Sequence, residues 1–514
     1  MNATELCNYV HDIMYKDLSE WNSLFSFCGH AHTTVWKNNS KHKNLLFFSK
    51  RVIPIGMKDQ KKRLNPYLLV ILSFVIIILI GSVLLMFPFS RTANNYGDYV
   101  DCLFLATSAT CVTGLNCFHQ GIATELTFAG QLILLVLIQV GGLGFITIFT
   151  FVFTIFNRKL QFKDRLFISL MVNNEDMAQV TTFVRKIILI SASCELLGFL
   201  LGLPVFLQYS SDVPSGLWNS LFTSISSYNN AGFDLFGNAS LIRGSGGFID
   251  TLPDWAYYYL CSYIMILIIL GGISFLVVMD IFAKRNLSQL RVFTKISLLM
   301  TGVLIVTGFL VFWMGQGFQR PFDALFQSVT CRTAGFATLD QDKLSVVNKV
   351  FSCFLMFFGG NPLGTAGGVK TTTLYIIVLA MVCYLTGRKV TSFHRRYSNE
   401  VIVKAMSLVI LGVAVIFLSF IGVYAFEAKM DVAALGLEST KASALAYEVF
   451  SAFGTVGVSA GVTPHLSYGS KIIIIILMFI GRLGPITFLQ LLGSKMRFDD
   501  QSKYRFVEED FLIG

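Results

Sequence analysis

The sequence has few charged side chains for its length. Only 14% of its 514 residues are Asp, Glu, Lys or Arg, whereas 54% are hydrophobic and the mean hydropathy is +0.65. The surface of a soluble globular protein needs roughly a quarter of its residues charged. The composition therefore excludes an ordinary soluble domain and places the chain in a membrane.

Sequence motifs for nucleotide binding and for metal-dependent catalysis are also missing. No GxxxxGK[ST] loop occurs, no GxGxxG follows a strand, and there is no HExxH. The ten cysteines form no CxxC pair, and most lie in apolar segments, so we interpret them as buried thiols. The spacing of Cys28, His30 and His32 is not specific for a metal. We predict a protein that is not an enzyme and binds no nucleic acid.

Long hydrophobic segments, in contrast, are abundant. A helix needs about 20 mostly apolar residues to cross some 30 Å of hydrocarbon, and eight segments of the sequence qualify. We predict spans at about residues 67–90, 126–156, 187–209, 256–282, 296–319, 348–386, 401–426 and 471–496. The sixth of these is interrupted by a glycine-rich stretch.

Basic residues gather in alternate connections between the predicted spans. The four clusters are Lys58, Lys61, Lys62 and Arg63; Arg158, Lys159, Lys163 and Arg165; Lys284, Arg285, Arg291 and Lys295; and Arg388, Lys389, Arg395 and Arg396. The intervening connections contain aspartates and fewer cations. Because cytoplasmic loops carry the excess of Lys and Arg, we predict a multi-pass protein of the cell membrane with both termini in the cytoplasm.

Four short, polar stretches separate the members of each pair of spans. They read SATCVTG to Gly114, SSYNNAG to Gly232, VTCRTAG to Gly335 and SAFGTVG to Gly457, and these glycines are 118, 103 and 122 positions apart. Such spacing predicts four copies of one unit, each a span, a re-entrant pore loop and a second span. The fold class we expect is an all-α polytopic membrane protein with eight transmembrane helices around a central ion pore.

The physical argument for a pore is the cost of unpaired backbone groups in lipid. Non-helical backbone at membrane depth is tolerated only against protein or beside a water-filled cavity. Glycines at the turn would aim backbone carbonyls inward, and a ring of carbonyls can replace the water shell of K⁺. The alternative for any single stretch is close packing of small residues between helices. The predicted filter consists of Thr110, Cys111, Val112, Thr113, Gly114, Asn229, Asn230, Ala231, Gly232, Arg332, Thr333, Ala334, Gly335, Gly454, Thr455, Val456 and Gly457.

These motifs, together with GGNPLGTAGGVKTTT at residues 359–373, resemble those of the Trk/Ktr/HKT superfamily of potassium transporters, and most of all the Ktr-type membrane subunit. The resemblance implies potassium uptake, a homodimer, and a separate cytosolic ring that binds the regulatory nucleotide. All four filter glycines are present, which in this superfamily goes with preference for K⁺ over Na⁺. Sodium coupling stays open. The resemblance covers about residues 66–496.

The expected domain organisation follows the four copies. It consists of a cytosolic N-terminal extension (1–65), repeat 1 (66–156), repeat 2 (185–282), repeat 3 with a broken second span (294–386), repeat 4 (401–496) and a cytosolic C-terminal tail (497–514).

The glycine-rich stretch in the sixth span predicts a gate beneath the filter. Proline and glycine break a helix at a cost of several kcal/mol, and the resemblance implies a mobile loop there; a passive kink is the alternative. The predicted gate residues are Gly359, Gly360, Asn361, Gly364, Thr365, Gly367, Gly368, Lys370 and Arg482. We expect Arg482 to act as barrier or latch, whereas Lys370 either faces the pore or extends toward the cytoplasm.

Three further expectations concern single charged residues. Arg332 would point behind the filter to an acidic partner, because a cation in the filter would oppose K⁺. Asp234 lies either at the outer mouth, where it would concentrate cations, or caps the next turn. Glu195 in the third span is isolated.

Two other functions compete with selective potassium uptake. One is a less selective, channel-like transporter of Na⁺ and K⁺. The other is an unrelated solute carrier, since carriers with a site at mid-membrane also use broken helices. A purely structural protein or receptor has no use for four re-entrant segments.

Overall fold

Helices form nearly all the regular structure in the part of the chain that the computed structural model describes. This part comprises residues 66–92, 98–144, 180–237, 240–244, 247–284 and 286–484, all of which belong to one unit of the chain, residues 64–514. The predicted N-terminal extension and C-terminal tail lie outside the described residues. So do residues 145–156 of the second predicted span and 485–496 of the last.

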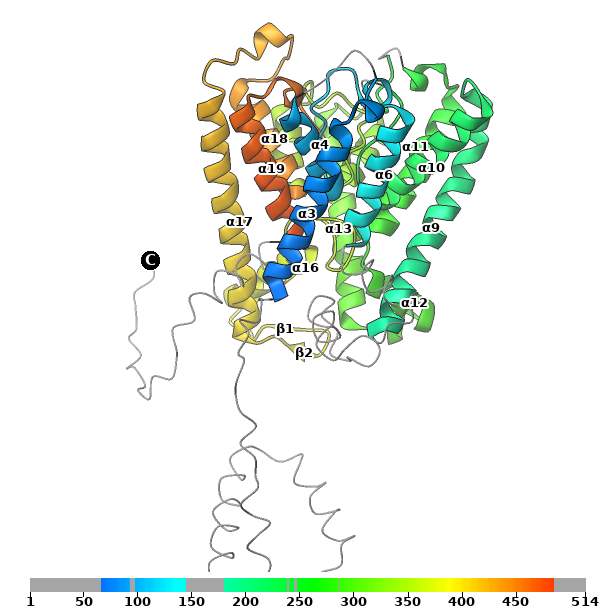
Figure 1. Ribbon diagram of the computed structural model, residues 1–514. Helices are drawn as coiled ribbons and strands as arrows, with labels where there is room; N and C mark the ends of the chain where they lie inside the picture. The colour runs from blue at the N-terminus through cyan, green and yellow to red at the C-terminus, as the bar shows by residue number, and fades with distance from the viewer. Residues whose placement is uncertain are drawn as a thin grey trace, which may run out of the picture. The chain divides into compact units, whose positions relative to one another are not determined.

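The main helices fall into two groups by their place relative to the four glycines. The outer helices are α3 (Pro66–Met86), α6 (Phe128–Leu143), α9 (Val180–Tyr209), α11 (Asp254–Gly272), α13 (Val292–Gly315), α15 (Val346–Phe357), α16 (Thr371–Leu385), α17 (Asn399–Phe426) and α19 (Tyr468–Leu483). The inner helices, which precede the four glycines, are α4 (Tyr99–Thr110), α10 (Val213–Tyr228), α14 (Pro321–Thr330) and α18 (Lys441–Gly454). Figure 1 shows the outer helices running in roughly one direction.

The outer helices suit a hydrocarbon environment. Four helices of the described residues are long and apolar enough to cross a membrane, at Thr182–Tyr209, Asp254–Gly272, Val292–Gly315 and Asn399–Phe426. On α17, Ile410, Phe417 and Leu418 are exposed to 69%, 62% and 68%. A face of this kind is unfavourable in water and favourable in lipid, because it has no hydrogen-bonding groups to satisfy.

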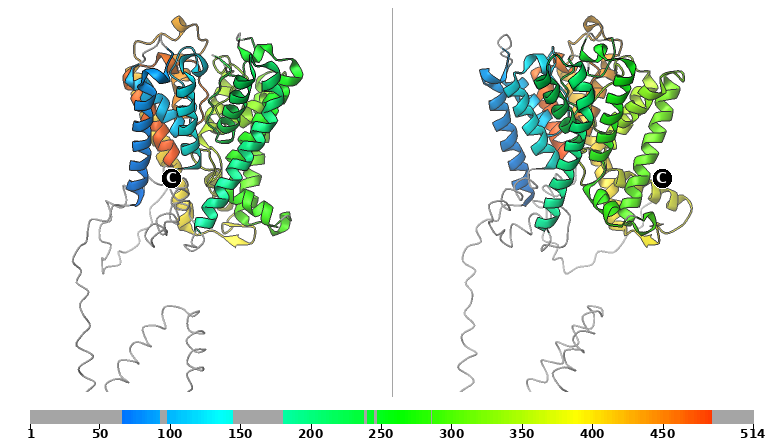
Figure 2. Two further views of the ribbon diagram at one scale, coloured as in Figure 1. Left: turned by 45° about the vertical axis from the view of Figure 1, so that its right-hand side comes forward. Right: turned by 90° about the vertical axis from the view of Figure 1, so that its right-hand side faces the viewer.

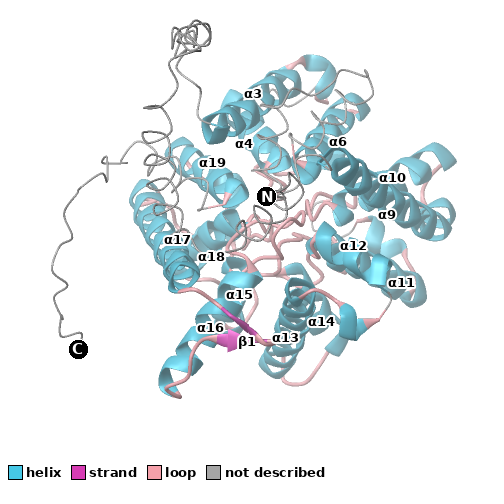
Figure 3. Cartoon of the chain, turned by 90° about the horizontal axis from the view of Figure 1, so that it is seen from below, coloured by secondary structure: helices cyan, strands magenta, loops and turns pink. Residues whose placement is uncertain are grey.

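Contacts between successive helix pairs close into a ring. Helix α6 packs against α10, α11 against α14, α15 against α18, and α19 against α4. Each helix that follows one glycine thus contacts the inner helix that precedes the next. Viewed from below, the helices surround a central region of loops (Figure 3), and Figure 2 shows the same helices from two further sides.

Glycines allow the closest of these contacts. A Cβ atom at Gly141 of α6 would overlap the carbonyl group of Thr110 at the end of α4. Likewise, a Cβ atom at Gly271 of α11 would overlap the carbonyl group of Tyr228 at the end of α10. Small residues let helix backbones approach in this way where lipid offers no hydrophobic driving force. The outer helices therefore press directly on the ends of the inner ones.

Two of the predicted spans are broken. Between α15 and α16 the chain leaves helical geometry over residues 358–370. The expectation of a continuous helix over 256–282 is wrong, because α11 ends at Gly272 and α12 (Phe275–Lys284) starts separately. The helix is interrupted because its backbone groups at the break hydrogen-bond to the segment between α15 and α16, which is remote in sequence. The amide of Asn361 donates to the Gly272 carbonyl (3.2 Å), and the amide of Phe275 donates to the Leu363 carbonyl (3.1 Å).

One small hairpin departs from the expected all-α class. Strands β1 (Thr391–Ser392) and β2 (Arg395–Arg396) pair antiparallel, with Thr391 opposite Arg396. They join α16 to α17 and contain part of one predicted cytoplasmic basic cluster. Short helices α5 (Ile122–Glu125), η2 (Pro88–Ser90), η3 (Phe248–Thr251), η4 (Leu287–Gln289), η5 (Ala433–Leu435) and η6 (Thr463–His465) complete the described elements.

A buried ion pair joins the two ends of the ring. Lys471 Nζ at the start of α19 lies 2.6 Å from Asp101 Oδ1 in the first turn of α4, and the two side chains are only 8% and 19% exposed. Asp101 lies within the first turn of α4, whose N-cap is Asp98. Removing one partner of such a pair leaves an uncompensated buried charge.

We expect Lys471→Met to lower the free energy of unfolding by about 3 kcal/mol, the usual cost of breaking a buried ion pair. The measurement is thermal unfolding of the detergent-purified chain. The matched control is Arg243→Met, which breaks a pair whose partner Asp254 is 80% exposed; surface pairs contribute about 0–1 kcal/mol. Equal losses in the two variants would contradict the special role of the buried pair.

Candidate functional site

Four glycines meet at the centre of the ring of helices. A Cβ on Gly114 would lie 2.5 Å from the carbonyl oxygen of Ala231, and one on Gly232 2.7 Å from that of Ala334. One on Gly335 would lie 2.7 Å from the Val456 carbonyl oxygen. The circuit closes because a Cβ on Gly457 would overlap the carbonyl oxygen of Thr113. All four glycines have φ between +69° and +95°, which side chains disfavour.

The inner helices end just before these glycines. Helix α4 ends at Thr110, α10 at Tyr228, α14 at Thr330 and α18 at Gly454. The C-terminus of a helix carries a partial negative charge, since its last carbonyls lack helical partners. Four such ends surrounding one point favour a cation there.

Hydroxyl groups hold the extended segments in place. The amide of Gly114 donates to Ser108 Oγ, and the amide of Gly457 donates to Ser451 Oγ, both over 3.1 Å. In the other two segments a hydroxyl donates to the carbonyl after the glycine: Ser226 Oγ to Phe233 (2.6 Å) and Thr330 Oγ1 to Phe336. These bonds fix each extended segment to the inner helix that precedes it.

Several hydroxyl oxygens of the predicted filter have no hydrogen-bond partner among the described residues. Thr110, Thr113, Thr333 and Thr455 are buried, and each has an unpaired Oγ1. A buried polar oxygen without a donor is costly unless something else satisfies it. Oxygen atoms in this state, converging from several segments, fit an alkali cation.

A polar network lies behind the second filter segment. Asn229 Nδ2 donates to Gln139 Oε1 (2.9 Å) and Glu195 Oε1 (3.2 Å), and Gln139 Nε2 donates to both carboxylate oxygens of Glu195. Ser191 Oγ also donates to Glu195, over 3.0 Å. The expectation that Glu195 is isolated is therefore wrong. Ser191 lies one turn away on the same helix, whereas Gln139 belongs to α6 and Asn229 is the C-cap of α10, and the sequence order conceals these two contacts.

Arg332 has no acidic partner in the described part of the chain. No carboxylate lies within ion-pair distance, and its Nε is buried without a hydrogen bond. The expected pairing is thus not found. Arg332 instead follows the C-terminus of α14, where its backbone amide donates to the Val329 carbonyl. The partial negative charge of a helix end favours a cation at this position.

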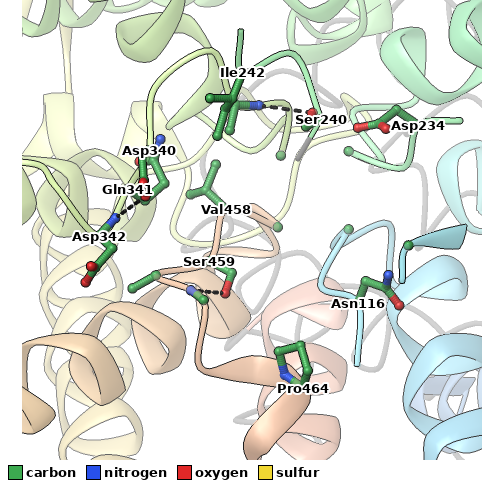
Figure 4. Close-up of a pocket in the computed structure, with 18 of the residues that line it drawn as sticks. Asn116, Asp234, Ser240, Ile242, Asp340, Gln341, Asp342, Val458, Ser459 and Pro464 are labelled. Carbon is green, nitrogen blue, oxygen red and sulfur yellow. Dashed lines mark hydrogen bonds between the residues drawn. The ribbon is translucent and has the colours of Figure 1, made fainter. Parts of the chain in front are cut away.

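A cavity of about 660 Å³ opens on one side of the glycines and is lined by all four of them. Asp234, Asp340 and Asp342 line it together with Arg243 and Lys343, from loops that follow different inner helices. Figure 4 shows the labelled aspartates and Asn116 distributed around the cavity. Asp234 lines the cavity, and its Oδ1 accepts from the backbone amide of Phe236 (3.1 Å), as expected of a residue that caps the next turn. That it concentrates cations stays a prediction. Burial raises the pKa of Asp234 to about 6.

On the opposite side of the filter lies the segment 358–370 between α15 and α16. A Cβ on Gly367 would collide with the side chain of Thr455. Thr365 donates through its amide to the Gly271 carbonyl (3.2 Å), and Gly368 to the Gly481 carbonyl (3.2 Å). The segment is therefore in contact with the filter and is held by the ends of α11 and α19.

Arg482 binds this segment and a distant helix together. Its guanidinium donates to the carbonyls of Thr365 and Gly141, and to that of Gly142 over 3.3 Å. Lys370 Nζ donates to the Ala366 carbonyl (2.6 Å) within the segment itself. The side-chain amide of Asn361 donates a hydrogen bond from Nδ2 to Thr301 Oγ1 (3.1 Å). The side chains of Arg482 and Lys370, both predicted to belong to the gate, therefore each donate to backbone carbonyls of this segment.

Sequence reasoning misses the role of Glu448 in the fourth segment. This carboxylate is fully buried and accepts from Ser459 Oγ, from the amide of Ala460 (3.0 Å) and from Thr463 Oγ1 (2.8 Å). It thereby ties α18 to the chain just beyond Gly457. The sequence indicates this role only by an acidic residue among the apolar residues that precede Gly457.

The same bonds exclude an enzymatic interpretation of GVSAG, residues 457–461, which matches the spacing around the nucleophile of many hydrolases. In those enzymes the serine lies on a turn between a strand and a helix and is activated by a histidine. Here Ser459 follows a helix, and its hydroxyl donates to Glu448.

We expect Glu448→Gln to lower the free energy of unfolding by about 1–3 kcal/mol, because one carboxylate acceptor becomes a donor and leaves a buried group unsatisfied. Thr463→Val removes a single hydrogen bond of the same cluster and should cost less, about 1 kcal/mol. Thermal unfolding of both variants tests this. A Glu448→Gln variant as stable as the parent would mean that the carboxylate does not hold the segment.

Comparisons with known proteins agree with this geometry. The TrkH family model, described as "Cation transport protein", matches residues 45–500. The chain is 33% identical over 473 residues to the potassium/sodium uptake protein NtpJ of Enterococcus hirae, covering 90% of this chain and all of the relative. It is 33% identical over 465 residues to the Ktr system potassium uptake protein B of Bacillus subtilis, covering 88% and 97% of the two chains.

A solved structure shows the same fold. The crystal structure of the potassium transporter TrkH from Vibrio parahaemolyticus superimposes with a TM-score of 0.63 at 17% sequence identity, over 96% of each chain. The sequence relatives and the family match confirm the resemblance on which the motifs were interpreted. The chain belongs to the TrkH family of cation transport proteins and is a membrane-embedded transporter of the Trk/Ktr type.

Proposed function

We propose that this protein takes up potassium across the cell membrane, through a pore that the segments ending at Gly114, Gly232, Gly335 and Gly457 form. The observation that carries the proposal is the closed circuit of glycines and carbonyl groups. Each glycine approaches the carbonyl of the next segment too closely for any side chain. A small ring of main-chain oxygens with unpaired threonine hydroxyls beside it suits a dehydrated monovalent cation.

The proposed architecture is four pseudo-repeats of span, pore loop and span, with eight transmembrane helices and four-fold pseudosymmetry. The repeated contact between each outer helix and the next inner helix supports it. The basic residues Lys284, Arg291, Arg395 and Arg396 support a cytoplasmic side opposite the cavity. On this basis both termini are cytoplasmic, and the cavity faces outward.

The cation specificity follows from the relatives and the filter together. One similar protein is named for uptake of potassium and sodium, and another for uptake of potassium. Glycine at all four filter positions supports preference for K⁺ over Na⁺ in this chain. A less selective transporter of both ions, or one whose potassium uptake depends on Na⁺, is the second candidate, and the name of the first relative favours it.

The proposed gate is the segment from Gly359 to Lys370, latched by Arg482. It contacts the filter threonine Thr455 through Gly367, and its backbone is bonded to the ends of α11 and α19. The guanidinium adds a positive charge beneath the filter, which opposes a cation passing close by. Movement of the segment would remove both obstacles.

The proposed assembly is a homodimer that rests on a cytosolic ring of regulatory subunits. This proposal comes from the resemblance to Ktr-type subunits, in which a nucleotide acts only through the separate ring. The exposed basic residues between α16 and α17 are a candidate docking surface for it.

We expect Gly232→Ser to lower the preference for Rb⁺ over Na⁺ by about tenfold, equivalent to about 1.4 kcal/mol. A Cβ at this position lies 2.7 Å from the Ala334 carbonyl oxygen and must displace it from the ring. Competitive uptake into proteoliposomes measures the ratio. The matched control is Gly436→Ser, which has a similarly positive φ of +76° but no atom within 4 Å of the new Cβ. Unchanged selectivity in Gly232→Ser would count against the filter assignment.

Deletion of residues 361–368 should raise the basal flux of Rb⁺, because the obstruction beneath Thr455 is removed. Arg482→Gln should raise it as well, since a neutral side chain loses the charge and weakens the bonds to Thr365 and Gly141. Both fluxes are compared with the parent at equal amounts of reconstituted protein. A folded deletion variant that transports no faster than the parent would rule out the gate.

A further inference from the structure

Two histidines from opposite ends of the sequence lie together at the outer cavity. His119 follows the first filter segment, and His465 ends η6 after the fourth; both line the cavity that contains Gly114 and Gly457. Their ring centroids are 5.0 Å apart, with 62° between the ring planes. Of the seven histidines in the sequence, only three fall among the described residues, so two of these three are paired here.

Neither imidazole is engaged by the surrounding protein. Within the described part of the chain, no hydrogen bond or ion pair is found for the ring of His119 or of His465, and both residues are exposed. A histidine held for structural reasons normally donates or accepts through at least one ring nitrogen. These rings contact each other and the solvent of the cavity.

The separation of the rings suits a shared metal ion. Zinc binds imidazole nitrogen at about 2.0–2.1 Å with tetrahedral geometry, and the nitrogen lies about 1.1 Å from the ring centre, so two imidazoles on one ion have centres about 5 Å apart. The observed 5.0 Å agrees with this value. Imidazole ligands select zinc, copper and nickel ions rather than Mg²⁺ or Ca²⁺, which prefer oxygen.

We propose that His119 and His465 bind one divalent transition-metal ion of the zinc type at the outer mouth, with water completing its shell, and that the bound ion inhibits cation uptake. The inhibitory effect rests on the proposed function, since it requires that the cavity lead to the filter. A doubly charged ion on the wall of the cavity repels monovalent cations approaching the ring and offsets the attraction of Asp234, Asp340 and Asp342.

Binding is tested first, without transport. Isothermal titration of ZnCl₂ into the detergent-purified full chain uses a background carrying Cys28→Ser, His30→Ala and His32→Ala, so that these three tail residues do not contribute. His119→Ala and His465→Ala should each remove one zinc equivalent or weaken its binding at least about tenfold. His394→Ala, which removes the third described histidine, should not. Equal zinc binding in all variants would overturn the proposal.

The second measurement is Rb⁺ uptake into proteoliposomes with ZnCl₂ outside. Inhibition of the parent that is relieved in both histidine variants supports the proposal. Zinc binding without inhibition would overturn the inhibitory role, and absence of Rb⁺ uptake at any zinc concentration would instead refute the proposed function. The double variant His119→Cys/His465→Cys should be more sensitive to Cd²⁺ than the parent, because thiolates favour softer ions than imidazoles do.

Discussion

The close approach of main chain to main chain at the four glycines determines how the surrounding helices and loops are arranged. At Gly232 and Gly335 the added Cβ atoms would lie 2.7 Å from the partner's Cα, so neither position has room for a side chain. Everything around this point serves to hold four extended segments at that distance. Serine and threonine hydroxyls bond them to the inner helices, and Glu448 anchors the last of them from behind.

The surrounding membrane explains why this support has to be so complete. Lipid supplies no hydrogen bonds, so every backbone group outside a helix needs a partner within the protein or in an aqueous cavity. The loop after α15 meets this requirement by exchange with other helix ends. Its backbone amides donate hydrogen bonds to carbonyls near the ends of α11 and α19, and its Leu363 carbonyl accepts one from the first residue of α12. The bonds are thus made where these helices begin or end. The break between α11 and α12 and the break between α15 and α16 therefore stabilise each other, because the backbone groups of one hydrogen-bond to those of the other.

Much of the local organisation could be predicted from the sequence because it depends on local patterns. Runs of apolar residues indicated the outer helices, and the repeated polar stretches ending in Gly114, Gly232, Gly335 and Gly457 indicated where the chain turns. The partner of Asp101 could not be predicted, since Lys471 lies 370 positions further along the chain. Pairings across the ring could not be predicted from one sequence. Three features depend on which repeats become neighbours. These are the bonds of Glu195 with Gln139 and Asn229, the absence of an ion pair to Arg332 among the described residues, and the contact of His119 with His465.

The contact between the last quarter of the chain and the first has a consequence for biosynthesis. Gly457 closes the circuit against Thr113, and Lys471 joins Asp101, so the central passage is enclosed only after the final helices have left the ribosome and entered the bilayer. A chain that lacks these residues has three of the four segments and cannot form the closed circuit. The ion pathway proposed above is therefore completed only once the last helices are in place.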